Sequence, residues 1–223
     1  MNTLFSKKSI EFLVENRLRN DKAWFEEHKS DYQKYLVEPF KALVTALAPA
    51  LSDIDGKLIC SPKIDGSISR IWRDIRFSKD KSLFRDMMWC MFVREKHVNL
   101  PEFFFVISPD NFFYGSGYYS AGTSSMESIR KLILDGDKDF KAALKVYENQ
   151  NLFALEGDTY KKSRFPGAPE NLRNWLNRKG ICFIHYSADF DLLYSEKLPD
   201  VVAEGYRTLE PIYKFLIKAE ERK

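Results

Sequence analysis

The first 50 residues of the chain place apolar side chains at helical spacing. One face of a helix over residues 7–20 carries Ile10, Leu13, Val14 and Leu18. Asn20 offers a stop to this helix, and Asp21 offers the N-cap of a second one. The same period continues to Pro39, where proline is expected to break or kink the helix. The N-terminal part is therefore predicted to be helical.

Beyond residue 55 the helical period is lost and short strand patterns follow. Asp-Gly turn dipeptides stand at 55–56 and 65–66. The candidate strands cover residues 67–72, 88–94, 102–108 and 111–114. The third of these is aromatic and β-branched, which suits a strand buried on both faces. Pro109 to Asn111 predicts a hairpin turn between the last two strands.

The second half of the chain mixes helical and strand patterns. Capping-box spacing at Ser124 predicts a helix that ends at Gly136, and Asp137 caps another through about residue 149. Residues 152–162 have the pattern of a hairpin. The remaining expected elements are a helix between Pro169 and Gly180, a strand at 181–186 with a possible partner at 190–194, and a long helix from Pro199 that Pro211 interrupts.

Helices and strands thus come in blocks without regular βαβ alternation, which indicates an α+β fold. Hydrophobic residues make up 44% of the chain and aromatic residues 15%, so a disordered chain is excluded and a large core is expected. We find no repeat or linker. The prediction is a single domain over residues 1–223, with a mainly antiparallel sheet packed against N-terminal helices, middle helices and a long C-terminal helix.

The sequence favours a cytoplasmic protein without membrane contact. The longest apolar run, residues 87–93, is far shorter than the roughly 20 residues that a spanning helix needs. The N-terminus lacks the order of a secretory signal. Cys60, Cys90 and Cys182 are odd in number and widely spaced, so we expect buried thiols in a reducing compartment.

The most distinctive chemistry lies in Arg70–Lys81, here called the basic segment. It contains five basic residues and two acidic ones: Arg70, Arg73, Arg76, Lys79 and Lys81 against Asp74 and Asp80. Its charge therefore equals the +3 of the whole chain. The arginines suit either bidentate capture of phosphate or carboxylate, with Asp74 orienting an arginine or binding a divalent metal, or structural ion pairs of the type Arg73–Asp74 and Asp80–Lys81.

Two further groups of residues are candidates for function. Gly115 and Gly117 stand between tyrosines, where successive amides suit an anion nest or, alternatively, a bulge or tight turn. His28 shares a helical stripe with Trp24 and Tyr32, which suits general acid–base catalysis or a core histidine bonded to a carboxylate. No histidines or cysteines have metal-ligand spacing, so no metal site is predicted.

The basic segment, R-x-x-R-D-x-R-F-S-x-D-K, resembles the signature of a widespread family of bacterial and fungal proteins of about this length, known only as a domain of unknown function. Further correspondences are Asn20, Trp24, Phe25, His28, Tyr32, the Tyr114–Gly117 stretch, Arg130 and the Arg164–Gly167 stretch. The chain departs from the family at Ser82–Arg85, where Thr-Pro-Tyr-Lys is usual. The resemblance implies an α+β fold and residues of interest, and it implies no reaction, substrate or cofactor.

Three functional hypotheses follow. The favoured one is binding of, or catalysis on, a small phosphorylated or carboxylated ligand, with these residues: Arg70, Arg73, Arg76, Lys81, Gly115, Gly117 and Arg130 for binding, and Asp74 and His28 for catalysis. The second is nucleic-acid binding, with Trp72, Phe77 and Phe84 available for stacking. The third is a non-catalytic interaction protein with a structural ion network. The sequence identifies no cofactor and does not decide whether the protein is an enzyme.

Overall fold

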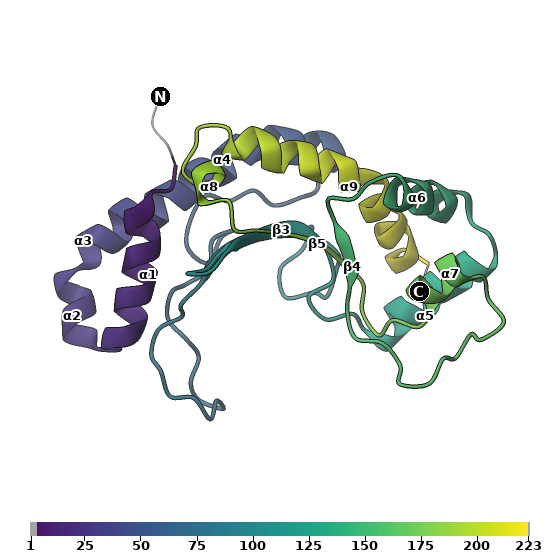
Figure 1. Ribbon diagram of the computed structural model, residues 1–223, viewed down its shortest axis with the longest axis horizontal. Helices are drawn as coiled ribbons and strands as arrows, with labels where there is room; N and C mark the ends of the chain where they lie inside the picture. The colour runs from purple at the N-terminus through teal and green to yellow at the C-terminus, as the bar shows by residue number, and fades with distance from the viewer. Residues whose placement is uncertain (1–3, 223) are drawn as a thin grey trace. The chain divides into compact units, whose positions relative to one another are not determined.

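The computed structural model describes residues 4–222 and has an α+β fold (Figure 1). The helices are α1 (Lys7–Arg19), α2 (Lys22–Glu27), α3 (Lys29–Tyr32), the π-helix η1 (Gln33–Val37), α4 (Glu38–Ile54), α5 (Thr123–Leu134), α6 (Lys138–Glu148), α7 (Glu170–Leu176), α8 (Phe190–Leu193) and α9 (Leu198–Glu220). The strands are β1 (Met88–Phe92), β2 (Glu102–Ile107), β3 (Phe112–Gly117), β4 (Ala154–Glu156) and β5 (Cys182–Ser187).

The described strands form one antiparallel sheet in the order β1-β2-β3-β5-β4. The chain divides into two compact units. The first unit contains the described residues up to Phe92, together with Phe104–Tyr114 and Tyr186–Glu204. The second unit contains Val93–Phe103, Gly115–His185 and the described residues from Gly205 onward.

Local sequence signals set the helix boundaries at the start of the first unit. Asn20 ends α1 in the left-handed conformation (φ 49°), and the Asp21 carboxylate accepts a hydrogen bond of 2.8 Å from the backbone N–H of Trp24. Both predictions are confirmed. Of the expected break or kink at Pro39, the break is wrong, because the helical run continues through Pro39 from the π-helix η1 directly into α4.

An aromatic cluster forms the core of the first unit next to the basic segment. The Phe84 ring is fully buried and lies 5.1 Å from the Phe25 ring and 4.4 Å from the Trp72 ring, centroid to centroid. Phe25 belongs to α2, whereas Trp72 lies near the start of the basic segment and Phe84 lies three residues beyond its end. Aromatic packing thus fixes both ends of this segment against the N-terminal helices.

The second unit packs α5, α6, α7 and the C-terminal part of α9 around buried aromatic rings. Trp175 of α7 is fully buried and lies 5.3 Å from Phe140 and 5.2 Å from Phe183. The Tyr118 hydroxyl donates a 2.6 Å hydrogen bond to the Glu220 carboxylate of α9. These contacts pack α6 and α7 on β5 and join the end of α9 to Tyr118, which follows β3.

Two expected strands and one expected hairpin do not form. Residues 67–72 make only isolated bridges, such as Trp72 with Phe84. The expected hairpin at 152–162 is wrong, since β4 pairs with β5 through Leu155 and Phe183. The possible strand at 190–194 is the short helix α8, which Asp189 caps through a 2.9 Å bond from the Leu192 N–H.

The helical predictions in the second half hold in position and differ at their ends. Helix α5 begins at Thr123 after Gly122, without a side-chain cap, so the capping box at Ser124 does not form. Asp137 does cap α6, accepting bonds from Asp139 and Phe140. Helix α9 continues through Pro211 without interruption.

The three cysteines form no disulfide within the described residues. Cys90 is buried, Cys60 and Cys182 are half-buried, and all three are free thiols. Burial raises the pKa of Cys60 to about 11 and that of Cys182 to about 12. Within residues 4–222, no helix is both long and apolar enough to cross a membrane.

Gly117→Ala is expected to destabilise the protein. Gly117 has φ +150°, and a Cβ there would lie 2.5 Å from both the Cys182 Cα and the Ile181 carbonyl oxygen. Backbone strain of this kind costs roughly 1–3 kcal/mol. Urea unfolding would measure the loss, with Gly167→Ala as control, because a Cβ at Gly167 meets nothing within 4 Å. Equal unfolding midpoints for the two variants would contradict the close approach of β3 to β5.

Candidate functional site

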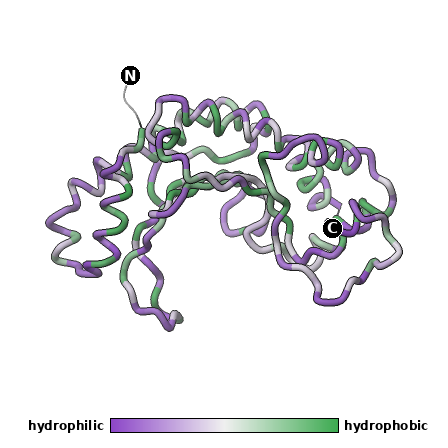
Figure 2. The backbone as a smooth tube through the Cα atoms, viewed as in Figure 1, coloured by the Kyte–Doolittle hydropathy of each residue, from purple (hydrophilic) through white to green (hydrophobic). Residues whose placement is uncertain are grey.

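The basic segment lies in a long loop of the first unit, between α4 and β1 (Figure 1). The backbone N–H of Arg73 donates to the Leu83 carbonyl at 2.9 Å, so the two arms of the loop are joined near its base. The tip is hydrophilic (Figure 2), although the Phe77 side chain on it is 95% exposed. The segment thus forms neither a helix nor a regular strand.

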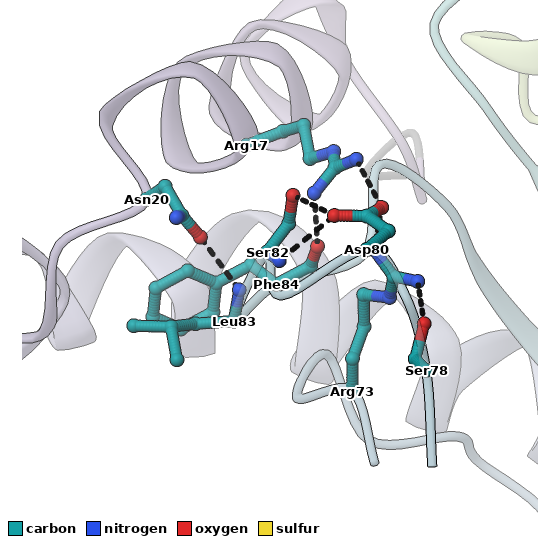
Figure 3. Close-up of polar contacts among 8 residues, drawn as sticks. All are labelled: Arg17, Asn20, Arg73, Ser78, Asp80, Ser82, Leu83 and Phe84. Atoms are coloured by element: carbon teal, nitrogen blue, oxygen red, sulfur yellow. Dashed lines mark hydrogen bonds and ion pairs between the residues drawn. The ribbon is translucent and has the colours of Figure 1, made fainter. Parts of the chain in front are cut away.

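The Asp80 carboxylate is the centre of a polar network, here called the Asp80 network (Figure 3). Its Oδ2 forms ion pairs with Arg17 of α1, at 3.0 Å, and with Arg73. Its Oδ1 accepts hydrogen bonds from the Ser82 backbone N–H at 2.9 Å and the Ser82 hydroxyl at 2.6 Å. One carboxylate therefore binds α1 and two parts of the loop.

The Asp80 network continues into the end of α1 (Figure 3). Arg17 also donates to the Phe84 carbonyl at 3.3 Å. The Asn20 side-chain oxygen accepts a 2.6 Å bond from the Leu83 backbone N–H. Arg73 reaches the Ser78 hydroxyl at 3.4 Å. The left-handed residue that ends α1 thus also anchors the return arm of the loop.

The electrostatics of the network favour an ionised Asp80. The hydrogen bonds from Ser82, with those from Arg73 and Arg17, hold the pKa of the Asp80 carboxyl well below its usual range. Two guanidinium groups share this single carboxylate, so the group of three side chains keeps a net charge of +1. A surplus cation remains at the base of the loop.

The other predicted binding residues of the segment have partners nearer the surface: Arg70 with Asp65 at 2.9 Å, Arg76 with Asp74 at 2.7 Å, and Lys81 with the Ile75 carbonyl at 2.9 Å. The hydrogen bonds from Arg76 lower the pKa of Asp74 to about 2. The expected pairs Arg73–Asp74 and Asp80–Lys81 are wrong, because Arg73 pairs with Asp80 and Asp74 pairs with Arg76.

His28 stacks on Trp24 where α2 meets α3. The ring centroids are 4.1 Å apart and nearly parallel. Its Nδ1 lies 2.8 Å from the Trp24 carbonyl oxygen, and since a carbonyl only accepts, Nδ1 carries the proton. The partner is therefore a backbone carbonyl and not the expected carboxylate.

Gly115, Gly117 and Arg130 belong to the second unit. The two glycines lie within β3, which runs further than the predicted strand 111–114. Arg130 is 8% exposed and donates from Nε to the Leu176 carbonyl at 3.0 Å and from Nη2 to the Arg178 carbonyl at 2.6 Å.

Around Asp80, the structure brings Arg73 together with Arg17 and Ser82, two residues that the sequence analysis did not predict.

The sequence analysis did not predict Arg17 and Ser82 as site residues, because only the tertiary fold brings them to Asp80. Arg17 stands three residues before Asn20, in the last turn of α1. A basic residue at this position is typically a solvated side chain that interacts with the helix dipole. Ser82 lies in the stretch that departs from the family pattern. Within the part of the chain that the structure describes, no group of three or more histidine, cysteine or acidic side chains could hold a metal ion.

These features define an α+β protein with a basic loop fixed to its N-terminal helix. Residues 8–215 match the model of the family described as conserved hypothetical protein DUF2461, and the chain belongs to that family. The resemblance inferred from the basic segment is thus confirmed. None of the curated proteins matches the sequence.

Asp80→Asn is expected to destabilise the protein in a pH-dependent way. The folded-state pKa of Asp80 lies below the unfolded value of about 3.9, so its contribution is complete above that pH and is lost as the pH falls toward the folded-state pKa. Urea midpoints of wild type and variant should therefore differ near neutral pH and converge in acid.

Asp74→Asn is the matched control, because Asp74 and Arg76 form an exposed pair in the same loop. Such pairs contribute little to stability. If Asp74→Asn and Asp80→Asn lower the urea midpoint equally at neutral pH, the Asp80 network does not anchor the loop.

Proposed function

We propose that the protein binds a small phosphorylated or carboxylated ligand through the basic segment and Arg17. One observation carries this proposal: Arg17 and Arg73, from separate parts of the chain, converge on one carboxylate oxygen. Two guanidinium groups in this arrangement suit the oxygens of a planar carboxylate or a tetrahedral phosphate. Asp80 neutralises only one of the two charges, so a further anion would be attracted to the same place.

The Arg17 and Arg73 side chains are exposed enough for a ligand to reach them. The side chains of Arg17 and Arg73 are 29% and 23% exposed, so both guanidinium groups reach the surface while their stems are packed. Each group has more N–H donors than its hydrogen bonds use. Their shared position is fixed by α1 and the loop base, which lowers the entropy cost of binding.

The exposed pairs Arg70–Asp65 and Arg76–Asp74 can add to ligand binding. Exposed ion pairs contribute little to stability, so a ligand anion can replace the carboxylate at little cost. Lys81 lies in the same loop, held by the Ile75 carbonyl. These side chains add positive charge to the same loop.

The proposal is one of binding and includes no reaction. A carboxyl with a pKa of about 2, as at Asp74, is ionised at neutral pH and is a weak general base. Its bonds to Arg76 support the role of orienting that guanidinium. His28 stacks on Trp24 and donates from Nδ1 to a backbone carbonyl, which supports a packing role.

A second candidate function, nucleic-acid binding, is favoured by Phe77. This ring is 95% exposed among cations, a combination that suits base stacking and phosphate contact. The other two aromatic candidates argue against it, since Trp72 and Phe84 pack on each other and on Phe25. One exposed ring gives a small footprint, so we favour the small ligand.

Arg17→Gln is expected to weaken stabilisation by anions, because it removes one guanidinium group of the Arg17–Arg73 pair. A panel of inorganic phosphate, nucleotides, sugar phosphates and dicarboxylates would be screened by thermal shift, where a ligand at 100 times its Kd adds about 2.7 kcal/mol to wild-type stability. Arg19→Gln is the matched control, because Arg19 lies in the same helical turn and, among residues 4–222, pairs only with Glu15 on the surface. The proposal fails if no anion stabilises the wild type, or if Arg17→Gln responds as Arg19→Gln does.

Phe77→Ala separates the two functions. Fluorescence anisotropy with labelled single-stranded oligonucleotides at low and high salt measures the polyanion contacts, since each phosphate contact steepens the salt dependence. The small-ligand proposal expects no oligonucleotide affinity that depends on Phe77. Tight, salt-sensitive binding that Phe77→Ala weakens would favour nucleic-acid binding instead.

A further inference from the structure

A second group of cations gathers around one aromatic ring in the second unit. The Tyr160 ring centroid lies 3.8 Å from the guanidinium carbon of Arg164, 5.5 Å from that of Arg130, and 5.7 Å from the Lys179 Nζ. Tyr160 and Arg164 belong to the loop between β4 and α7 (Figure 1). Lys179 follows α7, and Arg130 lies in α5. We call these four residues the Tyr160 cluster.

The charges of the Tyr160 cluster are not balanced within the described structure. Among residues 4–222, no carboxylate forms an ion pair with any of the three cations, Arg130, Arg164 and Lys179. In the basic segment, by contrast, Arg70, Arg73 and Arg76 each have a carboxylate partner. Three like charges around one ring repel one another, and attraction to the ring offsets only part of this cost. An anion would relieve the repulsion.

The C-terminal end of α7 holds the cluster in a fixed frame. The Asn177 carbonyl accepts a 2.9 Å bond from the Tyr160 backbone N–H, and the Asn177 side-chain oxygen accepts a 2.9 Å bond from the Arg164 backbone N–H. The Asn177 amide group also donates to the Ser163 hydroxyl at 3.1 Å. One residue thus fixes the loop on both sides of Lys161 and Lys162.

Arg130 gives the cluster a buried, immobile charge. Its Nε and Nη2 donate to two backbone carbonyls at the end of α7, where the helix dipole favours a cation. Among the described residues these are its only hydrogen-bond partners, and both are uncharged. Its positive charge is therefore retained in full while its position is fixed. A neighbouring cation, Arg178, is likewise held by uncharged groups, the Gly157 carbonyl and the Asn174 side chain.

We propose that Arg130, Arg164 and Lys179, arranged around Tyr160, form a binding site for a phosphate monoester group. Near neutral pH this group carries about −1.5 to −2 charges and three strong acceptor oxygens. The cluster offers a matching surplus of charge and two guanidinium groups, which are suited to phosphate oxygens. Tyr160 holds the stacked Arg164 guanidinium in place, so less entropy is lost on binding. The site goes beyond the proposed function and is built from second-unit residues alone.

Titration of the full-length protein with inorganic phosphate and with glycerol 3-phosphate, followed by ³¹P NMR and calorimetry, tests the site. Arg164→Gln and Lys179→Gln are each expected to weaken binding by roughly tenfold or more, because each removes a charge-assisted contact. Lys162→Gln is the matched control: it removes the same charge from an exposed residue of the same loop, and binding should change by less than about twofold.

Two further variants make the result specific. Tyr160→Phe should keep the affinity, since the ring is retained, whereas Tyr160→Leu should weaken it. Arg17→Gln should leave binding at the Tyr160 cluster unchanged, so a failure here is distinguishable from a failure of the proposed function. Affinity should also fall below about pH 6, as the ligand loses its second charge.

The proposal is overturned by either of two results. One is that the folded wild type binds neither ligand at millimolar concentration. The other is that Arg164→Gln and Lys179→Gln bind as tightly as Lys162→Gln, which would assign any observed binding to other residues. Tighter binding of glycerol 3-phosphate than of inorganic phosphate would show that the site recognises an esterified ligand.

Discussion

The ion pairs of Asp80 are the interaction on which the order of the first unit's loop depends. A loop of this length without regular secondary structure has few backbone bonds of its own, and its charged tip has little apolar area to bury. Aromatic packing of Trp72 and Phe84 fixes the two ends. Between these ends, one carboxylate joins Arg17, Arg73 and Ser82. Without it the basic side chains would have no common position.

The pairing of charges separates two kinds of cation in this protein. A cation that meets a carboxylate inside the chain, as Arg73 meets Asp80, is held by it and is partly neutralised. A cation held only by carbonyl groups or by a ring, as Arg130 is, is fixed while its charge remains. Fixed but uncompensated charge is the property that anion binding requires. By this criterion the Tyr160 cluster of the second unit suits anion binding as well as the basic segment does.

The sequence predicts the helices of this fold better than its strands. Helix starts at Asp21 and Asp137 were predictable because an N-cap is a local hydrogen bond. The partner of β4 was not, because Leu155 pairs with Phe183 across a helix and two loops, and no local pattern encodes that choice. The site follows the same rule. Arg73 and Asp80 were visible as a motif, whereas Arg17 and Ser82 joined them only through tertiary folding.

The family motif therefore has a structural explanation that is independent of any ligand. Asn20 ends α1 and binds the Leu83 amide, Arg73 and Asp80 pair, and Asp74 pairs with Arg76. The contacts of Asn20 and Asp80 would keep the loop in place even in a protein that binds nothing there. Arg164 is different, because its side chain contacts the Tyr160 ring and no carboxylate. A residue whose charge serves no internal partner is the stronger indication of an external one.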